Sequence, residues 1–334
     1  MSFFVASMYV AHCAPSVGPG HVLLLAQYAT YPLFALLVGL GAALGAKSAR
    51  RSWWVGPLVR GAVLIAMAEV LERQHSQIYI VLGFLGVLTW LAAPLARARP
   101  TVVACVGLAA LLVSPTLSAR AGTWSPDDFG GDLTILHLAD FLVAGGPALG
   151  GPYQIASMVF FASVGILLTH LLFPATGVQD GRRLAIGAAC GAACVAWLGL
   201  EAIAPFEMHA YEISYTVLTF DALLIVAITL VVAGLAGLLP RLAIPLAAMG
   251  SMSLTLYSLQ VGWLAYDVRV LHLGSLDNSW ANVVVLVVGS LVFALAWRAV
   301  VRVEPWRRGP IEGPVAALVR ALTPESARAL QPKG

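Results

Sequence analysis

Uninterrupted apolar runs of about twenty residues recur along this chain from one end to the other. Only 10% of its 334 residues are charged, whereas a soluble domain carries about 25%. This deficit is too large to be explained by a big soluble core, so most of the surface must face lipid rather than water. The composition therefore predicts an integral membrane protein that is embedded in the lipid bilayer. We expect no nucleic-acid partner.

In lipid, every backbone N–H and C=O needs a partner within the protein, so spanning structures are helices or closed barrels. Barrel strands alternate apolar and polar residues, and these runs do not. We therefore predict an all-α, polytopic protein with about ten transmembrane helices. The expected spans cover residues 2–15, 22–46, 56–71, 78–96, 101–118, 153–174, 184–204, 216–239, 243–266 and 281–301.

The spans are expected to form a single transmembrane helical domain, residues 1–303, followed by a short basic cytoplasmic tail, residues 304–334. A long connection, residues 119–152, separates the fifth and sixth spans. Its apolar piece, residues 133–143, is too short to cross a membrane, which favours a surface helix or a re-entrant segment.

The distribution of charge gives the spans a direction. With the N-terminus inside and the spans alternating, most of the 19 basic residues fall in inner connections or in the tail. Only Arg73, Arg120 and Arg269 fall on the outer side. Cytoplasmic loops carry such an excess of Lys and Arg, so both termini are expected in the cytoplasm.

Acidic residues and histidines show the opposite bias. Most of the 16 acidic residues, and every histidine except His170, lie in outer loops or at outer span ends. His12 ends the first apolar run, and His21 opens the second after a loop rich in proline and glycine. The two could share an outer cavity, where a neutral imidazole takes a proton or acts as a nucleophile. The alternative is that both are solvated interfacial side chains.

Carboxylates at the end of the third span are candidate substrate-binding groups. Glu69 and Glu72 are three residues apart and share one helical face, and His75 follows them. An ion pair between Glu69 and Arg73 is the competing interpretation.

Two further carboxylates are candidate substrate-binding groups. Asp221 lies inside the eighth span, where an ionisable group is costly and therefore indicates a functional site. Asp127 belongs to an acidic outer loop with aromatic residues, a composition suited to polyol or amine recognition. Hydrogen bonding between helices by Asp221, and a solvated turn at Asp127, are the competing interpretations.

Other common site motifs do not occur. The sequence has no Walker loop, dinucleotide fingerprint, metalloprotease helix or Gly-x-Ser-x-Gly elbow. The 4 cysteines lack metal-ligand spacing, so neither a metal site nor a disulfide framework is expected. Gly39 and Gly187 lie in small-residue stretches that are typical of helix packing in membranes.

Four segments of the sequence, residues 31–41, 153–170, 250–258 and 308–312, resemble one known family, heparan-α-glucosaminide N-acetyltransferase and its bacterial relatives. Residues 31–41, YPLFALLVGLG, are similar to its Leu-Phe-x-x-Leu-x-Gly signature. Residues 250–258, GSMSLTLYS, resemble its Gly-x-Met-Ser-Leu-Thr-x-Tyr segment, and residues 308–312, RGPIE, resemble its terminal Gly-Pro-Leu-Glu. Residues 153–170 look like its middle span, whereas the family's initial Arg…Asp-x-x-Arg-Gly segment is absent from this sequence.

The resemblance implies an enzyme of the transmembrane acyltransferase superfamily, located in the bacterial plasma membrane. It would move an acyl group such as acetyl from cytosolic acyl-CoA, without a metal, to a sugar or amino-sugar acceptor at the outer face. His21 is the nearest match to the family's catalytic histidine, and His12 stands where the family has an asparagine. The acceptor would be a small molecule or a glycan, and a homodimer is compatible with the sequence.

Basic residues on the inner side are the candidates for binding the acyl-CoA phosphates, because guanidinium groups form paired hydrogen bonds with phosphate oxygens. These candidates are Arg50, Arg51, Arg182 and Arg183. The alternative is that these arginines only determine topology.

Two other functions remain open. A transporter or permease for a small polar solute or a lipid-linked sugar would use the outer acids and Asp221 as its path. Neither an internal repeat nor a pair of broken helices, which many transporters show, is evident in the sequence. The third reading is a family member that has lost its activity.

Overall fold

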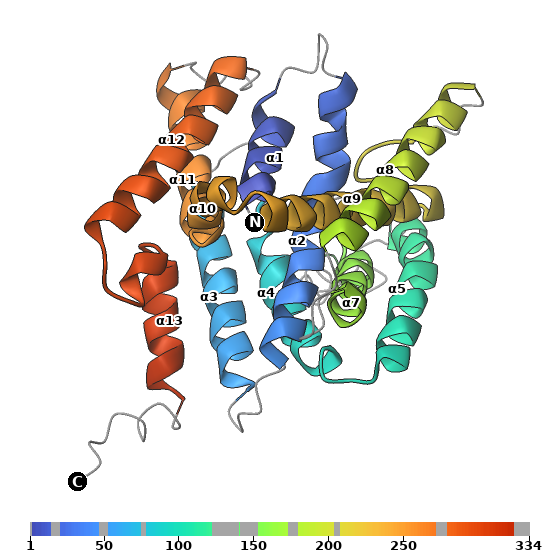
Figure 1. Cartoon of the computed structure of the whole chain (residues 1–334), viewed down its shortest axis with the longest axis horizontal. Coiled ribbons are helices and arrows are strands. Elements are labelled where there is room, and N and C mark those ends of the chain that lie inside the picture. The colour runs from blue at the N-terminus through green and yellow to red at the C-terminus, as the bar shows by residue number, and fades with distance from the viewer. Residues whose placement is uncertain are drawn as a thin grey trace, which may run out of the picture. The chain divides into compact units, whose positions relative to one another are not determined.

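The computed structural model describes residues 2–14, 21–46, 53–74, 78–121, 140, 153–172, 180–203, 208–271 and 279–323. Within these ranges the secondary structure is helical and contains no strand, which confirms the predicted all-α class. The α-helices, labelled in Figure 1, are α1 (Ser2–Cys13), α2 (His21–Ala46), α3 (Val55–Glu72), α4 (Leu82–Leu95), α5 (Pro100–Ala121), α7 (Ile155–Leu172), α8 (Asp180–Ile203), α9 (Tyr215–Leu238), α10 (Pro240–Gly250), α11 (Ser253–Tyr266), α12 (Trp280–Val300) and α13 (Glu312–Ala321). Two short elements complete them, the π-helical η3 (Asp267–Leu271) and the 3-10 helix η4 (Trp306–Arg308).

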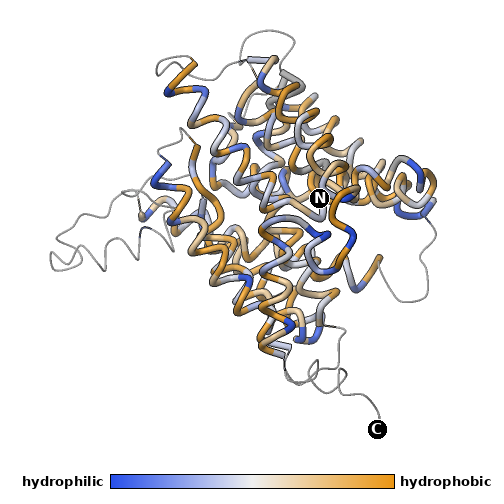
Figure 2. The backbone as a smooth tube through the Cα atoms, turned by 90° about the vertical axis from the view of Figure 1, so that its left-hand side faces the viewer, coloured by the Kyte–Doolittle hydropathy of each residue, from blue (hydrophilic) through white to orange (hydrophobic). Residues whose placement is uncertain are grey.

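Among the described residues, six helices are long and apolar enough to cross a membrane, namely α2, α5, α7, α8, α9 and α12. They confirm a helical, membrane-embedded protein. The helices α1 and α4 are shorter, and α3 carries Arg60, Glu69 and Glu72 within its 18 residues. Figure 2 shows that hydrophobic residues run along the helices while hydrophilic residues collect mainly toward helix ends.

The predicted ninth span, residues 243–266, is interrupted. α10 ends at Gly250 and α11 begins at Ser253, so the expectation of one continuous helix was wrong. Met252 stands at the start of α11 but supplies no side-chain hydrogen bond to cap it. The first N–H groups of α11 are instead bound by a carboxylate from the C-terminal segment, which is described below.

The chain divides into two compact units. The first unit contains residues 1–30, 45–86 and 240–334, and the second unit contains residues 31–44 and 87–239. Each unit has its own packing and its own polar contacts.

Helices of the second unit approach one another through small residues. A Cβ on Gly39 would overlap the backbone of Ala162, and one on Gly165 would overlap the carbonyl oxygen of Leu36. The helices α2 and α7 therefore touch backbone to backbone, as small residues permit in membrane proteins. This contact confirms the packing role predicted for Gly39.

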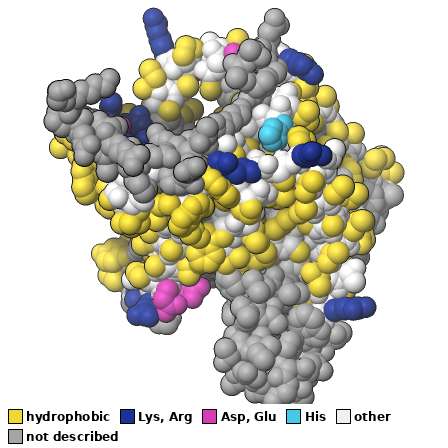
Figure 3. Space-filling model, turned by 90° about the horizontal axis from the view of Figure 1, so that it is seen from below, with side chains coloured by type: hydrophobic (Ala, Val, Ile, Leu, Met, Phe, Trp, Pro, Cys, Tyr) yellow, Lys and Arg dark blue, Asp and Glu magenta, His cyan; other side chains and the backbone are white. Residues whose placement is uncertain are grey.

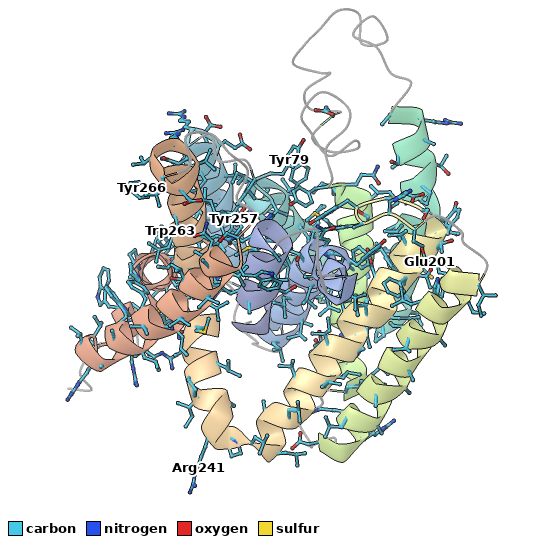
Figure 4. All side chains as sticks on the ribbon, turned by 90° about the horizontal axis from the view of Figure 1, so that it is seen from above. Tyr79, Glu201, Arg241, Tyr257, Trp263 and Tyr266 are labelled. Carbon is cyan, nitrogen blue, oxygen red and sulfur yellow. The ribbon has the colours of Figure 1, made fainter. Side chains whose placement is uncertain are left out.

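The helices α8 and α9 form a close pair in the second unit and run side by side when seen from above in Figure 4. A Cβ on Gly187 would lie 3.0 Å from Val231, which confirms the packing role predicted for this glycine. Where α9 meets α7, Leu168, Leu172 and Leu230 form a buried apolar cluster. This packing holds the later half of α9 against the end of α7.

In the first unit, α1 packs against α10, α11 and α12. The hydroxyls of Tyr9 and Ser290 share a buried hydrogen bond of 2.6 Å. The end of α11 is joined to α12 through Asn282, which accepts a hydrogen bond from Trp263 Nε1 at 3.3 Å and donates to Asp267 at 3.1 Å. Figure 4 labels Trp263 on this helix. The C-terminal helix α13 packs against α3.

Large apolar side chains lie on the outer surface of several helices. On α8, the exposed fractions of Val195, Leu200 and Ile203 are 70%, 61% and 83%. Figure 3 shows one face on which apolar side chains cover much of the described surface and basic side chains lie among them. Exposure of this kind is stable when lipid, rather than water, is the solvent.

Candidate functional site

Asp221 places a carboxyl group inside a membrane helix of the second unit. Its helix, α9, follows Ser214, whose hydroxyl accepts a hydrogen bond from the N–H of Val217 at 3.3 Å. Asp221 lies within the first two turns and is fully buried, with an exposed fraction of 0%. Neither carboxyl oxygen has a hydrogen-bond partner among the described residues, so the competing role of a helix–helix hydrogen bond has no support there.

The burial of this carboxyl has an energetic consequence. A buried polar group without a partner costs about 1–3 kcal/mol, and more when it is charged. Apolar residues at the same position would pack without that cost. A carboxyl that is buried inside a span without a partner among the described residues is therefore a candidate binding group.

Aromatic rings gather beside Asp221. The ring of Tyr31, from α2, stacks on that of Tyr211 with centroids 5.9 Å apart and an interplanar angle of 25°. The ring of Tyr153 lies 5.8 Å from Tyr31 and 6.5 Å from Tyr211. The Asp221 carboxyl acts electrostatically on both Tyr31 and Tyr211. We call Tyr31, Tyr153, Tyr211 and Asp221 the tyrosine–aspartate cluster.

Tyr211 is held in an unusual backbone conformation. Its φ is 68°, in the left-handed region that costs an L-residue about 1–2 kcal/mol. Its turn between α8 and α9 is tethered by the N–H of Met208, which donates to Glu201 Oε1 at 3.3 Å, and Figure 4 labels Glu201 at the end of α8. Strain of this kind persists where surrounding contacts determine the conformation, and here the stacked ring of Tyr31 supplies such a contact.

Further polar groups lie beside the cluster at the start of α7. Both side-chain amide atoms of Gln154 are buried and have no hydrogen-bond partner among the described residues. The backbone carbonyl of Gln154 accepts a hydrogen bond from Ser157 at 2.9 Å, and the Tyr31 hydroxyl lies near Ser157. Because an amide offers both donors and an acceptor, Gln154 adds buried hydrogen-bonding capacity at the residue that follows Tyr153 in the chain.

The phenol of Tyr211 makes the free energy of unfolding depend on pH in the alkaline range. Burial, and secondly the Asp221 carboxyl, raise the pKa of Tyr211 from 10.0 to about 12. The folded protein therefore holds the phenolic proton of Tyr211 more tightly than the unfolded chain does. The stabilisation that results is complete below pH 10.0 and is lost as the pH rises through about 12. We expect Tyr211→Phe to remove up to about 3 kcal/mol of the alkaline loss in unfolding free energy. Unfolding in mixed micelles across this pH window measures it, and identical alkaline slopes for the two proteins would contradict the assignment.

The structure places the predicted catalytic histidines in the first unit. His12 lies in the last turn of α1 and is half-buried, and His21 is the first residue of α2. For His21 the structure describes only the backbone, so the position of its imidazole lies outside the description. Four other predicted site residues lie outside the described residues: Arg50, Arg51, His75 and Asp127.

Glu69 and Glu72 lie at the end of α3, where both side chains are exposed. Glu69 forms an ion pair with Arg73, with 2.8 Å between the carboxylate oxygen and the guanidinium nitrogen. The Glu69 side chain is 63% exposed and the Arg73 side chain 75% exposed. This is the pairing that the competing interpretation expected. An exposed pair four residues apart contributes about 0.3–0.5 kcal/mol, so the geometry indicates a surface ion pair.

The two predicted arginines on α8 differ in their surroundings. Arg183 donates to Asp180 at 2.8 Å and to the carbonyl oxygen of Leu172 at 3.2 Å, with 16% of its side chain exposed. These bonds connect the start of α8 to the end of α7. Arg182 is exposed, and its guanidinium is therefore accessible to an anion.

Two of the segments that carry the resemblance meet in the first unit. Glu312 accepts hydrogen bonds from the N–H groups of Leu254 and Thr255, at 2.8 and 3.0 Å, and from the Thr255 hydroxyl at 2.6 Å. The N–H of Ile311 donates to the same hydroxyl at 3.2 Å. The first N–H groups of a helix lack partners within it and favour a negative charge, so Glu312 caps α11 from a distant segment. We call this contact the Glu312 cap.

Sequence reasoning missed the aromatic part of the cluster. Tyr31 stands only within the segment 31–41, and the sequence does not single out Tyr211. Tyr153 and Gln154 were noted only as the beginning of the middle span. These residues come from separate segments, so no spacing within the sequence indicates that they meet.

Comparisons with models of protein families, with curated proteins and with solved structures give no match to this chain.

Proposed function

We propose that the protein is a membrane-bound acyltransferase that moves an acyl group, such as acetyl, from cytosolic acyl-CoA to a sugar or amino-sugar acceptor. The tyrosine–aspartate cluster holds the acceptor. The observation that carries the proposal is the fully buried Asp221 carboxyl, whose oxygens lack partners among the described residues while tyrosine rings lie beside it. A group that accepts hydrogen bonds within a span suits an acceptor that bears amine or hydroxyl donors.

Two of the segments on which the resemblance rests also meet within the first unit. The segments 250–258 and 308–312 are far apart in the sequence, yet the Glu312 cap joins them through three hydrogen bonds. The two segments depend on each other physically, because the Glu312 carboxylate of segment 308–312 binds the free N–H groups at the start of α11, which belongs to segment 250–258.

The proposed reaction is a transfer between a thioester and the acceptor. The acceptor nitrogen or oxygen attacks the thioester carbonyl, the new C–N or C–O bond forms, and the C–S bond breaks. The acceptor's proton leaves through a base and is balanced by protonation of the departing CoA thiolate. The resemblance assigns the base to His21, with His12 as the second candidate.

The proposal includes a topology of about ten spans, with both termini in the cytoplasm of a bacterial plasma membrane. On that arrangement the exposed Arg182 lies on the inner side, where it can meet the acyl-CoA phosphates. Arg50 and Arg51 are proposed for the same role. Labelling of cysteines introduced at the two termini with a membrane-impermeant reagent in intact cells tests the orientation, since labelling of either terminus contradicts it.

Loss of the Asp221 charge tests the proposed function. With purified protein in liposomes, labelled acetyl-CoA and a panel of hexoses and hexosamines, Asp221→Asn should lower transfer at least about 100-fold because the acceptor loses its orientation. His21→Ala should abolish transfer if His21 is the base. Glu304→Gln is the matched control, since this carboxylate is half exposed and pairs with Arg308 on the surface. Wild-type protein that neither binds acyl-CoA nor transfers an acyl group would refute the proposal.

The second candidate is a transporter for a small polar solute or a lipid-linked sugar. The same observation favours it, because carboxyls inside spans also occur along solute and proton paths. Proton-driven uptake into proteoliposomes that needs no acyl-CoA and is lost in Asp221→Asn would establish this function in place of acyl transfer.

A further inference from the structure

We infer that an apolar groove at the end of α4 binds one anionic phospholipid, with an acyl chain along the groove and the phosphate at Arg97 and Arg99. The groove lies within the second unit and has a volume of about 390 Å³. Its lining residues come from three helices and one turn: Leu91, Pro94 and Leu95 of α4, Ala98 of the turn after α4, Val106 of α5 and Val159 of α7. None of them belongs to the tyrosine–aspartate cluster, so lipid binding here does not depend on the proposed function.

The wall that α5 and α7 form is fixed by direct contact between these helices. A Cβ on Gly107 would lie 2.8 Å from the Cβ of Ser163, so the two helices approach as closely as small residues permit. The Ser163 hydroxyl donates to the carbonyl oxygen of Val159 at 2.8 Å, which satisfies both polar groups within α7. All the lining side chains are apolar. The groove therefore offers hydrocarbon contact and no hydrogen-bonding side chain to its occupant.

The lining of the groove faces the surroundings of the protein. Leu91 and Val106 are 45% and 36% exposed, and Pro94 is exposed as well. In a membrane such a surface meets acyl chains instead of water. Val106 lies about 10 Å along α5 from Arg99, so an acyl chain beside both residues runs from the end of the helix toward the membrane interior. In Figure 1 the connection from α4 to α5 runs below both helices.

Two basic residues stand where the groove meets this connection. Arg97 and Arg99 flank the lining residue Ala98, and both are exposed. The backbone fixes the turn, since the N–H of Arg97 donates to the carbonyl oxygen of Pro94 at 3.1 Å and the N–H of Ala98 to that of Leu95 at 3.0 Å. The sequences of α4, the turn, α5 and α7 contain no Asp or Glu. A negative group at this helix end therefore meets two guanidinium groups and no carboxylate from the elements that line the groove.

The groove and the arginines together select a class of lipid. The bilayer solvates an acyl chain as well as an apolar groove does, so the groove positions a lipid but gives little preference between lipids. The arginines supply the preference, because each basic residue near the membrane surface strengthens the binding of an anionic head by about fivefold. Guanidinium groups also form paired hydrogen bonds with phosphate oxygens. In a zwitterionic phospholipid the cation of the head offsets the phosphate charge, and a free phosphate ion has no chain for the groove.

Native mass spectrometry of the purified full chain in detergent tests the inference. Phosphatidylglycerol and phosphatidylcholine with identical acyl chains are the matched probes, and titration of each lipid gives its dissociation constant. We expect phosphatidylglycerol to bind about tenfold or more tightly than phosphatidylcholine, because two arginines contribute. Glycerophosphoglycerol, which is the same head without acyl chains, should leave the bound phosphatidylglycerol in place. Its displacement by this soluble head would show a site for phosphate alone and would overturn the inference.

Variants separate the charge from the groove. Arg97→Gln combined with Arg99→Gln should bring the affinity for phosphatidylglycerol within about twofold of that for phosphatidylcholine. Val159→Phe should weaken the binding of both lipids, because its ring occupies the groove. Val106→Phe repeats this test at a position where the side chain is partly exposed and packing is less disturbed. Arg120→Gln is the control and should bind like the wild type, since this exposed arginine ends α5 about 30 Å from Arg99.

The salt dependence and the oligomeric state complete the test. Added salt should weaken the binding of phosphatidylglycerol and leave that of phosphatidylcholine unchanged, because screening acts only on the charge contact. Equal affinity of the wild type for the two lipids would overturn the inference, as would a preference that persists in the variant without both arginines. A dimer that dissociates in Val159→Phe would also overturn it, since a second copy would then occupy the groove. The unfolding midpoint of each variant in mixed micelles confirms that it is folded.

Discussion

Gly165→Leu is expected to disrupt the packing of the second unit. Even a Cβ at this position would overlap the carbonyl oxygen of Leu36, and that atom belongs to the backbone of α2. A leucine side chain would force α2 and α7 apart and remove the mirror contact of Gly39 with Ala162. We expect a loss of about 3 kcal/mol or more in unfolding free energy, at the upper end of overpacking costs, because a helix backbone cannot move aside as a side chain can. Unfolding of the purified protein by SDS in mixed micelles measures the loss.

Gly41→Leu provides the control for this prediction. Gly41 lies on α2 near Gly39, but a Cβ there would meet nothing within 4 Å. Its substitution is expected to change the unfolding free energy by less than about 1 kcal/mol, since leucine also favours helix. A result in which both variants unfold alike would show that α2 and α7 do not meet at Gly165.

Glu312→Ala is expected to release the C-terminal segment from α11. The carboxylate accepts three hydrogen bonds, two of them from N–H groups of Leu254 and Thr255 that the helix itself leaves without partners. Hydrogen bonds to a charged group contribute about 1.5–3 kcal/mol each, so we expect a net loss of about 3 kcal/mol after solvent access to the freed groups. Helix α13 should then become sensitive to trypsin at Arg320. Limited proteolysis and unfolding in micelles check the two effects.

Gly309 and Glu304 separate the Glu312 cap from other contacts of the same segment. Gly309 has φ 137°, and a Cβ there would overlap Glu312 Oε2, so Gly309→Ala should reproduce the effect of Glu312→Ala. Glu304→Gln should do little, because the Glu304–Arg308 pair of 3.3 Å is about half exposed and such surface pairs contribute little. Protection of α13 in Glu312→Ala equal to that of the wild type would show that the cap does not dock this helix.

Several parts of the fold were predictable because they depend on local composition. The apolar run that became α9 (Tyr215–Leu238) was expected at residues 216–239, and the run that became α12 (Trp280–Val300) at 281–301. Each residue of such a run contributes separately to the free energy of transfer into lipid. The total for a span can therefore be added up from the sequence alone. The break at residues 251–252 was not predictable in this way. The helix start that follows the break is capped by Glu312, which lies far away in the sequence.

Of the candidate site, only Asp221, the residue that is most costly to bury in a membrane, was predictable from the sequence. Asp221 stood out because an ionisable group in a span needs an explanation wherever it lies. Glu69 fitted the same rule, yet its pairing with Arg73 on an exposed helix end indicates a surface role. The difference between the two carboxyls is burial, and burial depends on neighbours that other segments contribute.

By itself, the sequence determined that this protein is helical and lies in a membrane, because the solvent preference of a long apolar run and the hydrogen bonding of its backbone are both local properties. The tertiary structure alone decided that Tyr31, Tyr153 and Tyr211 gather at Asp221, and that Glu312 begins a helix at Ser253. These arrangements require segments distant in sequence to meet, and their energies come from the contact between segments rather than from any one of them. For this reason the uninterrupted apolar runs predicted the class of the fold but not its site.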